Sequence, residues 1–100
     1  MNGTWRPHLP EIPERPGVYL FRDARGAILY VGKALNLRRR IASYFHRRRA
    51  HPRRLRRMIR RARAVTTHET GSELEALLLE SRLLKQETPP FNRLSTAYVA

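Results

Sequence analysis

The sequence predicts a small α/β domain, on three observations. Alternating apolar residues on both sides of a turn predict a β-hairpin over 17–32. Two amphipathic helical patterns follow, and a β-branched run at 64–69 then precedes a third helical pattern. The length of 100 residues allows one domain with a modest core. We therefore expect the strands and helices to pack together as one unit.

The hairpin turn is predicted at 23–26, because Gly26 tolerates the positive φ that such turns require. With that turn, Tyr19 lies directly opposite Tyr30, and both rings lie on one face of the hairpin. A bulge at Gly26 would shift this register. Taken alone, the two tyrosines are most simply explained as ordinary strand-forming residues. The same register pairs Arg22 with Ala27, Leu20 with Leu29 and Val18 with Val31, so the second face is apolar and is expected to be core.

The composition indicates a polyanionic partner. The chain has 21 Lys+Arg against 8 Asp+Glu, a formal net charge of +13, which favours nucleic acid first and an anionic membrane surface second. There is no cysteine, which excludes disulfides, thiolate metal sites and cysteine nucleophiles. No apolar run is long enough for a signal peptide or a membrane span. We therefore expect a cytoplasmic protein.

The segment before the hairpin is predicted to be extended, because each proline disfavours helix in the residue before it. A proline-motif ligand is one interpretation of this arm. Packing of Trp5, Leu9 and Ile12 on the domain is the favoured one. The prolines recur every third residue, at Pro7, Pro10, Pro13 and Pro16.

After the hairpin, Asn36 is predicted to cap a helix. Arg38 and Arg39 point away from its apolar stripe, whereas Arg40 lies at the edge and is expected to stack beside Tyr44. The stripe consists of Leu37, Ile41, Tyr44 and Phe45.

A second helix is predicted after a basic loop at 46–51, with Pro52 in its first turn. Its remaining positions are nearly all arginine, and residues 38–63 contain no acidic residue. A solvated face usually mixes the two signs of charge, so we interpret this one as a phosphate-contacting surface. The apolar stripe of the helix is Leu55, Met58, Ile59 and Ala62.

The third helix is predicted from a capping box, Ser72 with Glu75, and is expected to end near Gln86. Glu80 lies at the centre of its apolar face, where a carboxylate must be protonated, paired with a cation or bound to a metal. An Arg–Glu pair and a functional site are about equally good explanations. One carboxylate could hold a hard divalent ion such as Mg²⁺ or Mn²⁺, with water and substrate phosphate as further ligands. The apolar neighbours are Ala76, Leu77, Leu83 and Leu84.

The ordered set of these residues resembles the GIY-YIG nuclease family, over about residues 14–93. Within that family it is most similar to the nuclease domain of the excinuclease ABC C subunit type. The motifs are Gly17-Val18-Tyr19, Tyr30-Val31-Gly32-Lys33, Asn36 to Arg40, Ser43-Tyr44-Phe45, Leu77 to Glu80, and Pro90-Phe91-Asn92. Val18 and Val31 replace the isoleucines of the family motifs.

The resemblance implies a central three-stranded antiparallel sheet flanked by helices, and a metal-dependent endonuclease that nicks one DNA strand in repair or processing. It also implies a nuclease domain over 15–93, between an arm at 1–14 and a tail at 94–100. Glu80 would be the only protein ligand of one Mg²⁺ or Mn²⁺. Either Tyr19 or Tyr30 would position or deprotonate the attacking water, and Arg40 would steady the phosphate. Lys33, Tyr44 and Asn92 would line the site, and Gly32 would allow close approach.

From the residues alone, Asn92 is more simply explained as a turn residue than as a hydrogen-bond donor in a cleft. Two other functions stay open: a nucleic-acid-binding module that does not cut, and an accessory domain that is active only with a partner. Partners of two kinds are expected besides DNA, either repair proteins or a fused domain of a longer relative. The residues expected to contact DNA are Arg38, Arg39, Arg47, Arg48, Arg49, Arg53, Arg54 and Arg57.

Overall fold

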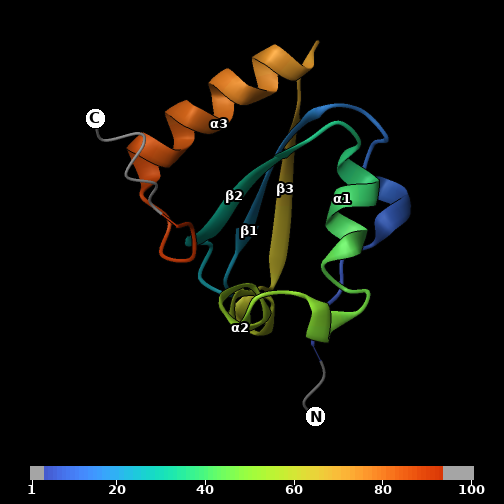
Figure 1. The fold of residues 1–100 in the computed structure, drawn as a ribbon, viewed down its shortest axis with the longest axis vertical. Helices are drawn as coiled ribbons and strands as arrows, with labels where there is room; N and C mark the ends of the chain where they lie inside the picture. Colours follow the sequence, from blue (N-terminus) through green and yellow to red (C-terminus); the bar gives the residue numbers. More distant parts are fainter. Residues whose placement is uncertain (1–3, 94–100) are drawn as a thin grey trace.

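A three-stranded antiparallel sheet with helices on both faces forms the described part of the chain, residues 4–93 of the computed structural model (Figure 1). The elements are the 3₁₀ turn η1 (Leu9–Glu11), β1 (Gly17–Arg22), β2 (Ile28–Ala34), α1 (Leu37–Ser43), the 3₁₀ turn η2 (Arg48–Ala50), α2 (Arg53–Arg61), β3 (Ala64–Glu69) and α3 (Glu73–Glu87). The strand order is β2-β1-β3, so β1 is central. The predicted α/β class and antiparallel sheet are confirmed. The expected tail at 94–100 and the first three residues of the arm lie outside the described residues. Within residues 4–93, no helix has the length and apolar character needed to cross a membrane.

The predicted hairpin register is wrong by two residues. Tyr19 pairs with Gly32 instead of Tyr30, and Phe21 takes the place opposite Tyr30. An even shift keeps Tyr19 and Tyr30, which lie beyond the bulge described below, on their predicted face, because side chains alternate with a period of two. Tyr19 and Tyr30 therefore share a face as diagonal neighbours, not as a direct pair.

The shift has two sources, one in the turn and one in β2. The loop is one residue shorter than predicted, 24–26 instead of 23–26, because the Asp23 N–H donates to the Ala27 carbonyl at 3.0 Å and so pairs Asp23 with Ala27. Gly26 has the expected positive φ, 86°. A bulge then leaves Leu29 without a partner on β1. As a result Leu29 packs on the tyrosine side of the sheet, whereas the sequence placed it on the opposite face.

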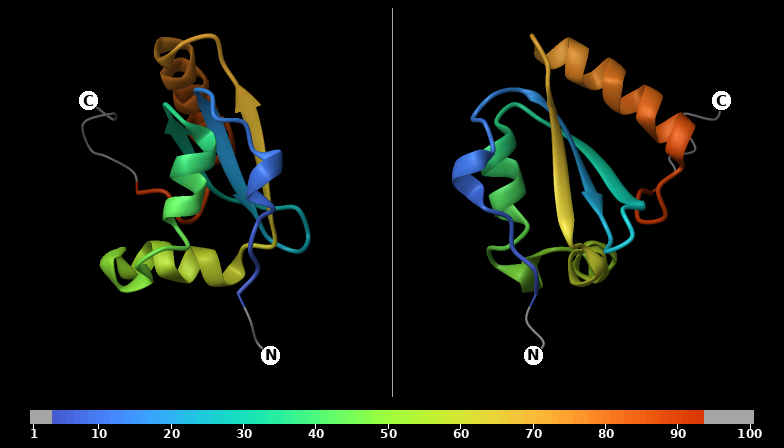
Figure 2. Two further views of the ribbon diagram at one scale, coloured as in Figure 1. Left: turned by 90° about the vertical axis from the view of Figure 1, so that its right-hand side faces the viewer. Right: turned by 180° about the vertical axis from the view of Figure 1, so that it is seen from behind.

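Both faces of the sheet are covered, as expected for a sheet flanked by helices. α1 and the N-terminal arm lie on one side and α3 lies on the other (Figure 2). The cluster under α1, which we call the aromatic core, includes Tyr19, Phe21, Leu29, Leu37, Ile41, Tyr44, Phe45, Met58 and Ile59. Among the residues that the structure describes, the cluster under α3 has four buried members, Val18, Leu20, Val31 and Ala76.

The predicted helix caps are confirmed. The Asn36 side chain accepts from the Arg39 N–H at 3.0 Å, and the Ser72 hydroxyl accepts from the Glu75 N–H at 3.2 Å. Glu75 completes the second cap by accepting from the Gly71 N–H at 2.6 Å. These caps set where α1 and α3 begin, and so where their side chains meet the sheet.

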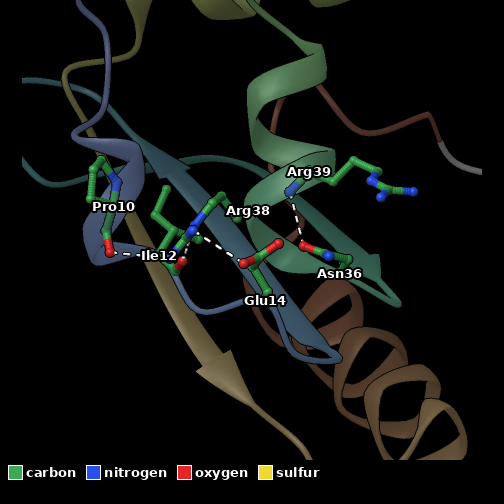
Figure 3. A network of polar contacts seen from close by, with 6 residues as sticks. All are labelled: Pro10, Ile12, Glu14, Asn36, Arg38 and Arg39. Carbon is green, nitrogen blue, oxygen red and sulfur yellow. Dashed lines mark hydrogen bonds and ion pairs between the residues drawn. The ribbon is translucent and has the colours of Figure 1, made fainter.

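The N-terminal arm packs on the domain as predicted, and Arg38 holds it there. The Trp5 ring meets the Phe45 ring edge-on, with 6.1 Å between the ring centroids. The Arg38 guanidinium donates to the Ile12 carbonyl at 2.8 Å and contacts Glu14 at 3.2 Å (Figure 3). Arg38 was expected to contact DNA, but its donors are instead committed to the arm.

Candidate active site

Three tyrosines from three different elements meet beside the β2 edge of the sheet. Tyr19 comes from β1, Tyr30 from β2, and Tyr44 follows the last turn of α1. The Tyr19 and Tyr44 hydroxyls are hydrogen-bonded at 2.6 Å, and the Tyr30 ring centroid lies 6.4 Å from that of Tyr19 and 6.2 Å from that of Tyr44. Tyr19 is 2% exposed and Tyr44 6%, whereas Tyr30 is partly exposed. Tyr30 is therefore the phenol of this trio that solvent can reach.

Gly32 makes the trio geometrically feasible. A Cβ on Gly32 would overlap the Tyr19 ring and its hydroxyl. The absence of a side chain on β2 thus leaves the space into which the Tyr19 phenol extends from β1. The sequence motif predicted that another group approaches Gly32 closely. In the structure that group is the side chain of Tyr19.

Burial keeps the two inner phenols protonated. It raises the pKa of Tyr19 and of Tyr44 well above the ordinary value for a phenol. The Tyr19–Tyr44 hydrogen bond and the charge of Arg40 lower the pKa of Tyr19, while Tyr30 and Glu80 raise it, all by less than burial does. Arg40 and Glu80 therefore both lie within electrostatic range of Tyr19.

His51, which the sequence did not indicate, stacks on the Tyr44 ring, and the expected stacking of Arg40 beside Tyr44 stays a prediction. The His51 and Tyr44 rings lie nearly parallel, with 15° between their planes and 5.7 Å between their centroids. His51 Nε2 donates to the Ser43 carbonyl at 2.8 Å, which fixes the imidazole against the ring. No sequence pattern indicated His51, since the contact crosses the irregular segment between α1 and α2.

Glu80 lies on the face of α3 that turns toward the sheet. Its neighbours Leu83 and Leu84 pack on the cluster under α3, as predicted. Leu77 does not, because it is 43% exposed, and Leu79 packs there instead. Glu80 is therefore at the edge of the apolar face and half-buried, not at its centre and fully buried.

The Arg–Glu pair that would explain Glu80 structurally is not formed. Among the residues that the structure describes, the ion pair between Arg38 and Glu14 is the only one. Burial raises the pKa of the Glu80 carboxyl, and the charge of Lys33 opposes that rise. A half-buried carboxylate without a hydrogen-bonded partner fits the binding of a hard cation, which needs few protein carboxylates when water and phosphate complete its shell.

A hollow of about 160 Å³ lies where β2, α1 and α3 meet. Lys33 and Arg40 line it with cationic groups, and Glu73 adds a carboxylate one turn from Ala76. Glu73 stands in the first turn of α3, where a negative charge is favourable. Within residues 4–93, no group of three or more His, Cys, Asp or Glu side chains could hold a metal ion.

Asn92 is neither a free donor in a cleft nor a simple turn residue. Its amide accepts from the Val31 N–H and donates to the Val31 carbonyl, both at 2.9 Å. The side chain thus pairs with the β2 edge as a neighbouring strand would, next to Gly32. Arg54 supports the same segment by donating from Nε to the Phe91 carbonyl at 2.8 Å, a structural contact that the sequence did not indicate; its expected DNA contact stays a prediction.

The other expected DNA-contacting arginines lie on the surface around α1, η2 and α2. The side chain of Arg48 lies outside the described part of the chain. The exposed ones are Arg39, Arg47, Arg49, Arg53 and Arg57.

Comparison with known proteins adds independent findings. A model of the UvrC-like GIY-YIG domain matches residues 15–93. The UvrABC system protein C of Oleidesulfovibrio alaskensis is 51% identical over 81 residues, which are 81% of this chain and 12% of that protein. The protein of the same name from Sphingopyxis alaskensis is 52% identical over 82 residues, 82% of this chain and 13% of that protein. The chain thus spans about an eighth of the length of these curated relatives.

Among solved structures, the GIY-YIG N-terminal endonuclease domain of UvrC from Thermotoga maritima matches with a TM-score of 0.75 and 33% identity, over 85% of this chain and 91% of that one. That domain is bound to magnesium as its catalytic divalent cation. A variant of the same domain with an asparagine replaced by alanine also holds the cation, and matches with a TM-score of 0.76 and 31% identity, over 86% of this chain and 91% of that one.

Proposed function

The chain belongs to the UvrC-like GIY-YIG domain family, and from this premise we propose that it is a divalent-metal-dependent endonuclease that hydrolyses one phosphodiester bond in one strand of DNA. One observation carries the proposal. Glu80 is a half-buried carboxylate without a hydrogen-bonded partner among the described residues, within electrostatic range of Lys33 and of Tyr19. A protein that only bound DNA would have no use for a carboxylate that repels phosphate at this point.

Glu80 would hold the metal as its one protein carboxylate, and magnesium is the cation in the related Thermotoga maritima domain. A bound divalent ion supplies Lewis-acid polarisation of the phosphate and lowers the pKa of water. The ion and Lys33 would both offset the cost of keeping the Glu80 carboxylate charged in a partly apolar setting.

Tyr30 is the phenol of the trio that would orient or deprotonate the attacking water, because solvent reaches it and does not reach the other two. Tyr19 and Tyr44 keep their protons and hold each other through their hydroxyls, so their role is to position Tyr30. Arg40 and Lys33 would offset the negative charge that builds on the phosphate in the transition state.

Asn92 acts as a positioning residue in this scheme. By pairing with Val31, Asn92 holds β2 in place beside Gly32. The same strand carries Tyr30 and Lys33, so its position sets where these two side chains lie. The exposed arginines Arg39, Arg47, Arg49, Arg53 and Arg57 would bind the DNA backbone, so affinity should fall steeply with salt.

We further infer a role in nucleotide excision repair, because the curated relatives are UvrABC system C proteins. Those relatives are much longer than this chain, which makes activity only with a partner or a fused domain the second candidate.

The test is nicking of a supercoiled plasmid with Mg²⁺ or Mn²⁺, wild type beside Glu80→Gln. We expect the variant to bind DNA but to cut about a thousandfold more slowly, which corresponds to about 4 kcal/mol of lost transition-state stabilisation. Glu87→Gln is the matched control, since Glu87 is exposed at the end of the same helix. Equal cutting by wild type and Glu80→Gln would contradict the metal-ligand role. Binding without cutting by wild type would favour the partner-dependent candidate.

A second readout does not depend on cutting. Mg²⁺ should raise the melting temperature of wild type and leave that of Glu80→Gln unchanged. Without metal, Glu80→Gln should be at least as stable as wild type near neutral pH, because burial disfavours the charged form of the carboxylate.

A further inference from the structure

A second hollow is lined by the Tyr44 ring and by residues of the segment from His51 into α2. Its volume is about 90 Å³, and it opens between the end of α1 and the face of α2. It shares no lining residue with the hollow beside Lys33 and Arg40. Its lining residues are Tyr44, His51, Leu55, Arg56, Ile59 and Arg60.

One wall of this hollow is aromatic and firmly held. The Tyr44 ring stacks on His51, while its hydroxyl is bonded to Tyr19 at 2.6 Å. His51 is fixed in turn by its bond to the Ser43 carbonyl. Tyr44 therefore belongs to both sites: its hydroxyl bonds to Tyr19 in the trio, and its ring lines the hollow.

The floor and the mouth differ in chemistry. Leu55 and Ile59 form an apolar floor on the stripe of α2 that packs on the aromatic core. Arg56 and Arg60 stand one turn apart on α2, at i and i+4, and project from one side of the helix. Neither guanidinium has an ion-pair partner among the described residues. An apolar slot thus carries two free cations at its opening.

We propose that this hollow receives one unstacked nucleobase of the DNA, with Arg56 and Arg60 contacting the phosphates on either side of that nucleotide. The proposal rests on the proposed function, since it places the DNA beside Tyr44. Aromatic and apolar walls suit the face of a base, and every base has such a face. The charge of a phosphate, by contrast, would be poorly accommodated on the floor of Leu55 and Ile59.

The size of the hollow supports a single ring. Its volume is about 90 Å³. Sites that enclose a whole small molecule are much larger, at roughly 300–1,000 Å³. A base would insert while its sugar and phosphates stay outside, where the two arginines are. Insertion requires an unpaired base, so the domain should prefer DNA with an unpaired nucleotide over a fully paired duplex.

The test is a competition binding assay in EDTA, where no cutting occurs. The probes are a duplex with one unpaired thymidine, the same duplex fully paired, and the same bulge carrying an abasic site. We expect wild type to bind the thymidine bulge about tenfold more tightly than either of the other two probes. His51→Ala and the double variant Arg56→Gln/Arg60→Gln should lose this preference.

Arg53→Gln/Arg57→Gln is the matched control. It removes the same charge from the same helix, but at exposed positions that do not line the hollow. It should weaken binding to all three probes by the same factor and keep the preference. The melting temperature of each variant is measured alongside, and Arg56 and Arg60 lie at the surface edge of the helix, so the double variant should fold.

A direct readout is permanganate oxidation of the unpaired thymidine, which attacks the exposed face of the pyrimidine ring. Wild type and the Arg53/Arg57 control should protect this thymidine, whereas His51→Ala should not. Equal affinity of wild type for all three probes, or an equal loss of preference in the control pair, would overturn the proposal. Plasmid nicking separates the two proposals: nicking without a preference rejects only the base site, and a preference without nicking rejects only autonomous cutting.

Discussion

α1 and α3 cover opposite faces of the same three strands, but they are held to the sheet very differently. The seven-residue α1 carries Leu37 and Ile41, which have no exposed surface. The fifteen-residue α3 buries only Ala76, and its Leu74 and Leu78 are 64% and 58% exposed. The shorter helix is thus embedded in the core, whereas the longer one rests on it.

The difference matches what each side contributes to the site. The α1 side supplies phenols, which must be held in one geometry, and packing is the means of holding them. The α3 side supplies a carboxylate, which must keep its charge and reach a cation. Deep burial would neutralise Glu80 or require a partner for it. A lightly packed helix therefore suits this residue, and a tightly packed core suits Tyr19 and Tyr44.

The largest expected effect comes from comparing one leucine-to-alanine substitution on α1 with one on α3, which tests how firmly each helix is held to the sheet. Leu37→Ala should lower the free energy of unfolding by about 2–5 kcal/mol, because it leaves a cavity in the aromatic core. Leu78→Ala, the matched change on α3, should alter it by less than about 0.5 kcal/mol. Urea unfolding of both variants measures the difference. Similar losses at the two positions would show that the helices are held equally.

A smaller effect is expected from Gly32→Ala. The new Cβ would overlap the Tyr19 ring, which the aromatic core keeps from moving aside. We expect a loss of about 1–3 kcal/mol in unfolding free energy, together with slower nicking at temperatures where the variant is folded. Unchanged stability with unchanged nicking would mean that the trio is not rigid.

The smallest effect concerns alkaline pH and the hydrogen bond between the buried phenols. Burial raises the pKa of Tyr19 in the folded chain above the value of about 10 that it has when unfolded. The unfolded chain therefore loses this proton first, and the free energy of unfolding should fall as the pH rises above about 10. Tyr19→Phe should weaken that fall, at a cost of about 0.5–1.5 kcal/mol at neutral pH from the lost hydrogen bond, because the Tyr44 hydroxyl keeps Tyr30 as a partner. Urea unfolding at pH 8 and pH 11 tests both; an equally steep alkaline loss in the variant would contradict the assignment to Tyr19.

Local features of the chain were predictable because each depends on neighbouring residues. The caps at Asn36 and Ser72, the helix stripes and the third strand follow from periodicity and from side-chain hydrogen bonds a few residues apart. The face on which Tyr19 and Tyr30 lie was also correct, since alternation along a strand survives an even register shift.

The register itself was not predictable, because the bulge at Leu29 is favoured by contacts far along the chain. Leu29 packs in the aromatic core, and the Phe91 N–H donates to its carbonyl at 3.0 Å. The roles of Arg38 and Arg54 were missed for the same reason. Each donates to carbonyls of a segment at least 26 residues away. An arginine-rich sequence does not indicate which of its arginines form hydrogen bonds within the protein.

The sequence by itself determined the α/β class, the starts of the helices, the family motifs and the strong positive charge of this protein. These properties rest on local periodicity and composition. Only the tertiary structure decided that Tyr19 and Tyr44 are buried and bonded while Tyr30 stays accessible, and that Glu80 keeps an unpaired carboxylate near them. Burial and charge pairing depend on which distant side chains arrive at the same place, and packing of α1 and α3 on the two faces of the sheet makes that choice.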